Sequence, residues 1–127
     1  MRQLLTLIVI LFFASSCETA TFVDYYIDNQ SDSAITVKGT NIIASSEINM
    51  TINSNEREDI ATWSKLGKET DYFEPTSMFG FDLVITNVLG DTLVKDYKVL
   101  SNWTSDIYDH RTSASHEYIL VITNVDF

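Results

Sequence analysis

The sequence has one cysteine, one proline and only four glycines among its 127 residues. A single cysteine cannot form a disulfide within the chain, so a hydrophobic core alone must stabilise the fold. The glycines are not arranged to cradle a phosphate, and no serine has the Gly-x-Ser-x-Gly frame of a nucleophile elbow. No cysteine besides Cys17 is present to act as a thiol nucleophile. We therefore expect no enzyme and no cofactor, with a small hydrolase as the remote alternative.

Basic side chains are also scarce, with 8 Lys and Arg against 18 Asp and Glu and a formal net charge of −10. Nucleic acids require basic contacts to their phosphates, so this excess argues against a nucleic-acid partner. It also argues against binding by charge to an anionic lipid surface. Two interpretations of the acidic surface remain: it keeps an exported domain soluble, or it meets a cationic partner or a bound metal.

The only long apolar run lies at the N-terminus. Arg2 precedes an apolar segment from Leu4 to Phe13, and the small residues Ala14, Ser15 and Ser16 stand directly before Cys17. A basic start, a short apolar segment and a small-residue cleavage site are typical of a secretory signal peptide. The run is shorter than the about 20 apolar residues that a membrane-spanning helix needs. The sequence therefore predicts an exported protein.

The end of this segment resembles the lipobox of bacterial lipoproteins, although Ala14 stands where that family usually has leucine. The resemblance implies that Cys17 is acylated and becomes the first residue of the mature protein. The serine-rich lipobox followed by Glu18 is similar to that of small uncharacterised lipoproteins of Bacteroidota. The alternative is an ordinary signal peptide cut near Ser16, which leaves Cys17 as a free thiol.

Three parts of the chain follow from this resemblance: a lipoprotein signal peptide over 1–16, a short tether over 17–20 and one domain over 21–127. We expect a cell-envelope protein attached to the outer membrane by lipid on Cys17, facing either the periplasm or the cell surface. Three or four extended residues reach only about 10 to 14 Å, so the domain would sit close to the bilayer.

The rest of the chain shows the two-residue alternation of β-strands and no helical stripe of any length. The predicted strands are Thr21 to Asp28, Ala34 to Lys38, Glu47 to Ser54, Asp59 to Trp63, Phe79 to Thr86, Thr92 to Val99 and His116 to Asn124. With polar connections every eight to twelve residues, this pattern predicts an all-β, antiparallel β-sandwich of about seven strands, immunoglobulin-like by default.

Pairing and burial are predicted from the same pattern. Thr21 to Asp28 and Ala34 to Lys38 are expected to form the first hairpin, with Thr21, Val23, Tyr25 and Ile27 on the buried face. Phe79 to Thr86 and Thr92 to Val99 form the second, closed by a turn at Gly90. The strand His116 to Asn124 is apolar on both sides and is expected at the centre of a sheet.

Two segments lack a periodic pattern and are expected to carry any contact: Ser64 to Ser77 and Leu100 to Ser115. The alternative for the first is a short covering helix around Trp63 to Lys68. Trp63 and Trp103 border these segments, where an exposed indole can stack on a sugar ring; the alternative is that both fill the ends of the core.

Three groups of side chains have residue types that occur in metal sites or in acid–base catalysis. His110 and His116, near Asp106 and Asp109, have no recognised zinc spacing, and we expect solvated polar residues at a strand entry. Asp28, Gln30 and Asp32 have the alternating oxygens of a calcium loop without its glycine or closing glutamate. Glu56, Glu58 and Asp59 are expected to form a solvated turn, with acid–base catalysis as the alternative.

These observations predict a lipid-anchored binding or structural module of the cell envelope. Its expected partners are the membrane, through Cys17, and an envelope protein or a glycan. The alternative function is a carbohydrate-binding or adhesion domain on the cell surface.

Overall fold

A computed structural model describes residues 18–41, 45–71 and 81–127 of the chain. The strands are β1 (Ala20–Asn29), β2 (Ile35–Asn41), β3 (Ser46–Ile52), β4 (Glu56–Leu66), β5 (Phe81–Asn87), β6 (Trp103–Asp109) and β7 (Ser113–Ile122). Short 3-10 helices accompany them: η1 (Leu100–Asn102) precedes β6, and η2 (Asn124–Asp126) follows β7. No helix in these residues has the length and apolar character needed to cross a bilayer.

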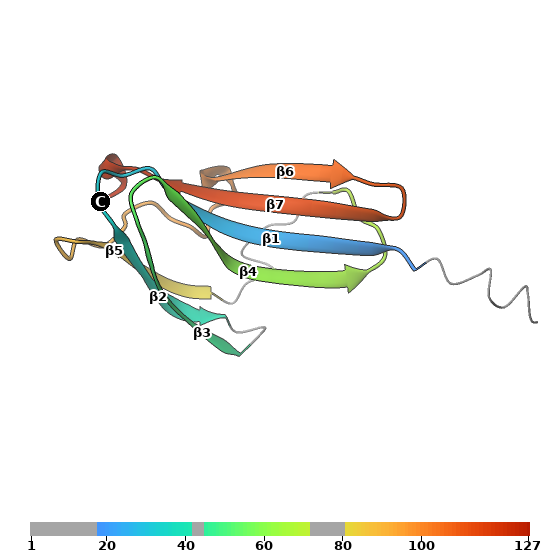
Figure 1. Cartoon of the computed structure of the whole chain (residues 1–127), viewed down its shortest axis with the longest axis horizontal. Helices are drawn as coiled ribbons and strands as arrows, with labels where there is room; N and C mark the ends of the chain where they lie inside the picture. The colour runs from blue at the N-terminus through green and yellow to red at the C-terminus, as the bar shows by residue number, and fades with distance from the viewer. Residues whose placement is uncertain (1–17, 42–44, 72–80) are drawn as a thin grey trace, which may run out of the picture.

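The strands form two sheets, one with the order β4-β1-β7-β6 and one with the order β3-β2-β5. The larger sheet runs along the long axis of the molecule, and the smaller sheet lies at the end that also holds the C-terminus (Figure 1). All strand pairs are antiparallel except β1 with β7, which are parallel. The predicted all-β sandwich of seven strands is therefore confirmed.

The immunoglobulin-like topology is not confirmed. In an immunoglobulin constant domain the first strand lies at the edge of a sheet and pairs with the second. Here β1 lies between β4 and β7, and β2 belongs to the other sheet. The predicted first hairpin is therefore wrong. Both edges of β1 are taken by partners that come later in the chain, so the connection after Asn29 crosses to the other sheet.

The second predicted hairpin forms only at its turn. Gly90 has a φ of 88°, as the predicted turn requires, and Thr86 bridges Thr92. The Leu93 N–H donates to the Ile85 carbonyl oxygen at 2.8 Å. Beyond this point the chain leaves β5, and residues 93–99 form no strand, so the prediction of a strand from Thr92 to Val99 is wrong.

Strand boundaries differ from the prediction in three other places. β4 is longer than predicted and extends through Leu66, which excludes the alternative helix around Trp63. β6 occupies part of the segment predicted to be irregular, and the first two residues of the predicted strand at Phe79 lie outside the described residues. β7 begins earlier, at Ser113, and lies between β1 and β6, which confirms its central position.

Both sheets contribute to one hydrophobic core. Buried side chains include Val23, Tyr25 and Ile27 of β1, Ile35 and Val37 of β2, Ile48 and Ile52 of β3, Ile85 of β5, and Tyr118, Leu120 and Ile122 of β7. Tyr25 stacks on Tyr118 at 5.1 Å between ring centroids and meets Trp103 edge-on at 5.9 Å. Burial raises the pKa of the Tyr25 phenol, and the neighbouring Tyr118 raises it further. The predicted buried face of β1 is confirmed, since Thr21, Val23, Tyr25 and Ile27 are all fully buried.

Candidate functional site

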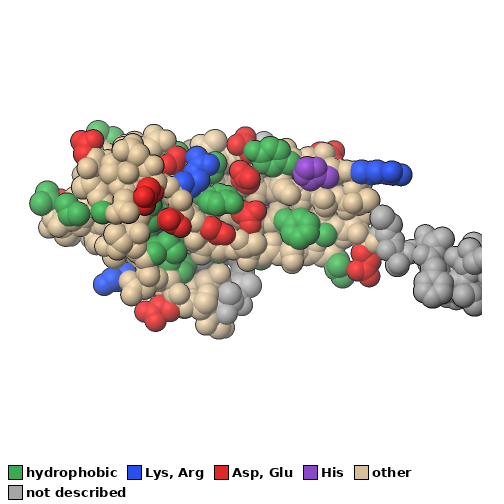
Figure 2. Space-filling model, viewed as in Figure 1, with side chains coloured by type: hydrophobic (Ala, Val, Ile, Leu, Met, Phe, Trp, Pro, Cys, Tyr) green, Lys and Arg blue, Asp and Glu red, His purple; other side chains and the backbone are tan. Residues whose placement is uncertain are grey.

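The solvent-facing side of the larger sheet carries a row of carboxylates that crosses three strands. Asp24 on β1 is in register with Glu117 on β7, and Glu117 is in register with Asp106 on β6. Side chains on neighbouring strands at such positions stand side by side, about 5 Å apart. In Figure 2 acidic side chains gather across the middle of this face, with hydrophobic side chains on both sides of them.

Aromatic side chains border this acidic row. One row along the strands, Phe22 lies opposite Ser115, which lies opposite Tyr108. Phe22 is 44% exposed and Tyr108 is 46% exposed. On the other side of the row, Tyr26 is half-buried between β4 and β7. We call this surface the acidic–aromatic face and define it as Phe22, Asp24, Tyr26, Asp106, Tyr108 and Glu117.

The electrostatics of this face are negative. Burial raises the pKa of the Tyr26 phenol, and three carboxylates, those of Asp24, Glu117 and Asp59, raise it further. Arg57 acts in the opposite direction and pairs with Asp28 at 3.2 Å, at the border of the face. Among the described residues, none of the salt bridges includes Asp24, Asp106 or Glu117. Within the described part of the chain, these three carboxylates are therefore not part of an ion pair.

Replacing Glu117 with glutamine is expected to stabilise the protein, because like charges directly opposite each other on a sheet oppose folding. Glu117 has a carboxylate on each side, so we expect a gain of about 0.5 to 1 kcal/mol in the free energy of unfolding. Urea denaturation at low salt measures this gain, which should shrink as salt screens the charges. Glu47→Gln, at an exposed position on β3, is the matched control and should change little. A loss of stability in Glu117→Gln would contradict the repulsion.

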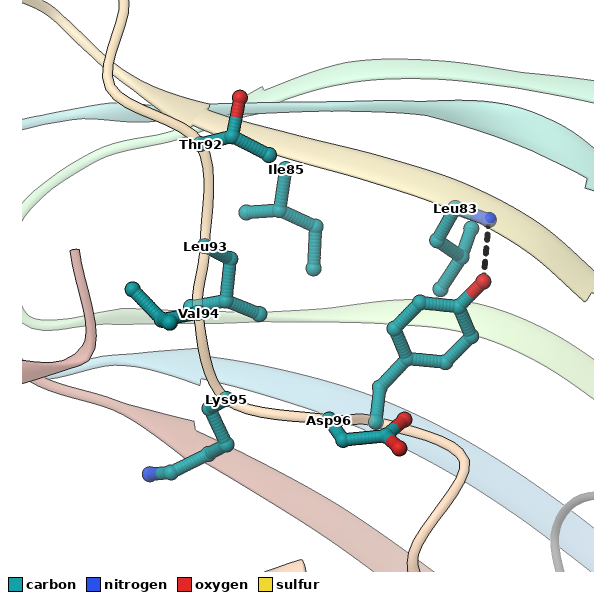
Figure 3. A pocket seen from close by; sticks show the side chains of 8 residues that line it. Leu83, Ile85, Thr92, Leu93, Val94, Lys95 and Asp96 are labelled. Carbon is teal, nitrogen blue, oxygen red and sulfur yellow. Dashed lines mark hydrogen bonds between the residues drawn. The ribbon is translucent and has the colours of Figure 1, made fainter.

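A hollow of about 360 Å³ lies between β5 and the segment Thr92–Tyr97, which we call the strap (Figure 3). Its lining consists of Leu83 and Ile85 from β5 and of the six strap residues. The hollow exists because the strap leaves β5 after Leu93. At its far end the Leu83 N–H donates to the Tyr97 hydroxyl oxygen at 2.9 Å, where a neighbouring strand would supply a carbonyl. The result is a groove along the edge of the smaller sheet, lined by apolar side chains of β5 and by both apolar and polar side chains of the strap.

Lys95, the one basic residue of the strap, forms hydrogen bonds with other parts of the domain. The Lys95 Nζ donates to the Val121 carbonyl oxygen at 2.7 Å and to Asp126 at 2.9 Å. Burial alone would raise the pKa of Asp126, but hydrogen bonds from Lys95 and Thr123 outweigh it and lower the pKa. These hydrogen bonds tie the strap to β7 and η2, so the Lys95 ammonium group is already used within the fold.

The two tryptophans named as possible sugar-binding residues lie apart. Trp103 on β6 is 7% exposed, and its Nε1 donates to the Tyr97 carbonyl oxygen at 2.7 Å. Trp63 on β4 is partly buried and packs against the core. The strands β1 and β7 lie between them. These positions favour the alternative, in which both indoles fill the core.

The two histidines also have different environments. His116 is fully buried, with Nε2 at 2.7 Å from the Glu69 carbonyl oxygen, while His110 is exposed. The prediction of a solvated residue is therefore wrong for His116, whose strand begins three residues earlier than predicted and buries it. In the described ranges, no group of three His, Cys, Asp or Glu side chains is placed to hold a metal ion.

The remaining predicted residues are not brought together. Asp28 contacts Gln30 and Arg57, whereas Asp32 contacts Asn124, so these oxygens do not converge on one point. Glu56, Glu58 and Asp59 belong to β4 rather than to a turn, which corrects that prediction. Cys17 lies outside the described residues.

Sequence reasoning missed the acidic–aromatic face. The alternation of Phe22, Asp24 and Tyr26 along one strand was a usable signal, but the alignment with Glu117 depends on the parallel pairing of β1 with β7. No protein-family model, curated protein or solved structure matches this chain.

Proposed function

We propose that this chain is a lipid-anchored binding module of the bacterial cell envelope, held at the outer membrane by an acylated Cys17. The observation that carries the binding role is the acidic–aromatic face. It exposes Phe22 and Tyr108 beside carboxylates whose mutual repulsion opposes folding. Natural proteins often keep such destabilising arrangements where function requires them.

The position of β1 close to Cys17 in the sequence supports the anchoring role. β1 begins at Ala20, three residues after Cys17, and the Gly67 N–H donates to the Thr19 carbonyl oxygen at 2.8 Å. The chain between the lipid and this hydrogen bond would span about 7 Å at most. An acyl chain on Cys17 would therefore hold the Gly67 end of the sandwich near the bilayer. The acidic–aromatic face, on the side of the sandwich, would remain open to neighbouring proteins.

Replacing Cys17 with alanine is expected to release most of the protein from the membrane fraction, because the acyl chain supplies the attachment. Fractionation of cells measures the release from the membrane, and labelling with radioactive palmitate measures the loss of the acyl chain. Ser16→Ala keeps a small residue before the cysteine and should remain attached and labelled. Attachment of Cys17→Ala at the wild-type level would refute the lipid anchor. Protease treatment of intact cells, with a periplasmic protein as the control, then assigns the side of the membrane.

A further inference from the structure

We propose that the acidic–aromatic face binds an extended, positively charged segment of another envelope protein. Lysine or arginine side chains of that segment pair with Asp24, Glu117 and Asp106 and pack their stems against Phe22, Tyr26 and Tyr108. This inference rests on the proposed binding function and names the chemistry of its partner.

The arrangement of the face fits cations presented by an extended chain. The three carboxylates span about 10 Å across three strands, given a strand spacing of about 5 Å. In an extended segment the side chains at positions i and i+2 point the same way and lie about 7 Å apart. Two such cations therefore fit along the row. The exposed side chains of Phe22 and Tyr108 lie one row away, and aromatic rings attract cations close to them.

The chain itself provides an example of the ion pair. Arg57 reaches from β4 to Asp28 on β1, and its charge partly offsets the rise in the pKa of Tyr26 on the same face. An arginine is thus already paired with a carboxylate at the border of the face. The three carboxylates of the central row have no equivalent cation among the described residues.

Other partners fit this surface less well. Nucleic acid and anionic lipid headgroups would be repelled by the carboxylates. A metal ion requires ligands that converge on one point, whereas these side chains stand in a row across three strands. No group of three His, Cys, Asp or Glu side chains able to hold a metal occurs in residues 18–41, 45–71 and 81–127. Charge complementarity therefore favours a basic protein segment.

The test uses full-length lipidated protein, purified in non-ionic detergent, and fluorescein-labelled nonaarginine as the probe. Fluorescence anisotropy at about 0.15 M salt measures its affinity. The face variant Asp24→Asn/Asp106→Asn/Glu117→Gln should bind at least about tenfold more weakly than the wild type. The control variant Glu47→Gln/Asp71→Asn/Asp82→Asn removes the same charge from exposed positions elsewhere and should lose less than about threefold. The urea midpoint of the face variant should not fall below that of the wild type, so lost binding cannot result from unfolding.

The aromatic part is tested in the same way. Phe22→Ala and Tyr108→Ala should each weaken the binding of nonaarginine about threefold, whereas Val84→Ala, an exposed residue of the other sheet, should not. Equal losses in the face and control triple variants, or no saturable binding by the wild type at this salt concentration, would overturn the proposal. The variant Cys17→Ala separates the anchor proposal from the binding proposal. Its loss from the membrane fraction tests the anchor, whereas its affinity for nonaarginine, which should equal that of the wild type, tests the acidic–aromatic face alone.

Discussion

Replacing Asn29 with alanine is expected to lower the free energy of unfolding by about 3 to 5 kcal/mol, the largest effect we expect from one side chain. Asn29 ends β1 and is fully buried. Its Nδ2 donates to the carbonyl oxygens of Ser33, Ile52 and Asn53 at 2.8, 3.0 and 3.1 Å. Its Oδ1 accepts from the N–H and the hydroxyl of Ser31 at 3.1 and 2.6 Å. Alanine would remove all of these hydrogen bonds at the point where the chain crosses between the sheets.

Urea denaturation of Asn29→Ala and Asn29→Asp measures this effect. Aspartate keeps the acceptor for Ser31 but turns an oxygen towards three carbonyl oxygens, so it should destabilise at least as strongly as alanine. Asn49→Ala, the same change at an exposed position of β3, is the control and should stay within about 0.5 kcal/mol of the wild type. A small effect in both Asn29 variants would show that the crossing does not depend on this side chain.

Alternation alone was enough to predict the class of fold and the buried face of β1. Val23, Tyr25 and Ile27 share one side of a strand with polar neighbours on the other, and a two-residue period fixes which side is buried. The same logic gave β7 a central position, because Ile119 and Leu120 point to opposite faces and both are buried. These are local properties of the chain, so they are visible in the sequence.

Strand partners are not local properties. A hairpin between β1 and β2 is the simplest pairing, since five residues separate the predicted strands. In the structure the connection instead crosses to the other sheet, and the side chain of Asn29 binds the backbone there. An asparagine in a polar stretch resembles an ordinary turn residue. Only its contacts with the β3–β4 turn, which lies far along the chain, distinguish it. The acidic–aromatic face was hidden for the same reason, because it depends on the pairing of β1 with β7.

The strand β2 continues further than predicted, through Asn41. The sequence predicts that this strand ends at Lys38, before Gly39, since glycine weakens strands. In the structure it lies inside β2, opposite Leu83 of β5 and Ile48 of β3. A Cβ added at Gly39 would lie 2.3 Å from the Asp82 carbonyl oxygen and 2.8 Å from the Leu83 Cδ2. Gly39 is therefore required for the close approach of the two strands.

Replacing Gly39 with alanine is expected to cost about 2 to 3 kcal/mol in the free energy of unfolding, because the added methyl group can be accommodated only if β5 moves away from β2. Hydrogen exchange should locate this loss, with faster exchange at the β5 amides that pair with β2 and little change at the pairing of β1 with β7. Thr40→Ala, at the exposed neighbouring position, is the control. A stable Gly39→Ala protein with unchanged hydrogen exchange would contradict the close packing of β2 against β5. It would also contradict the shape of the groove beside the strap, because β5 forms one wall of that groove.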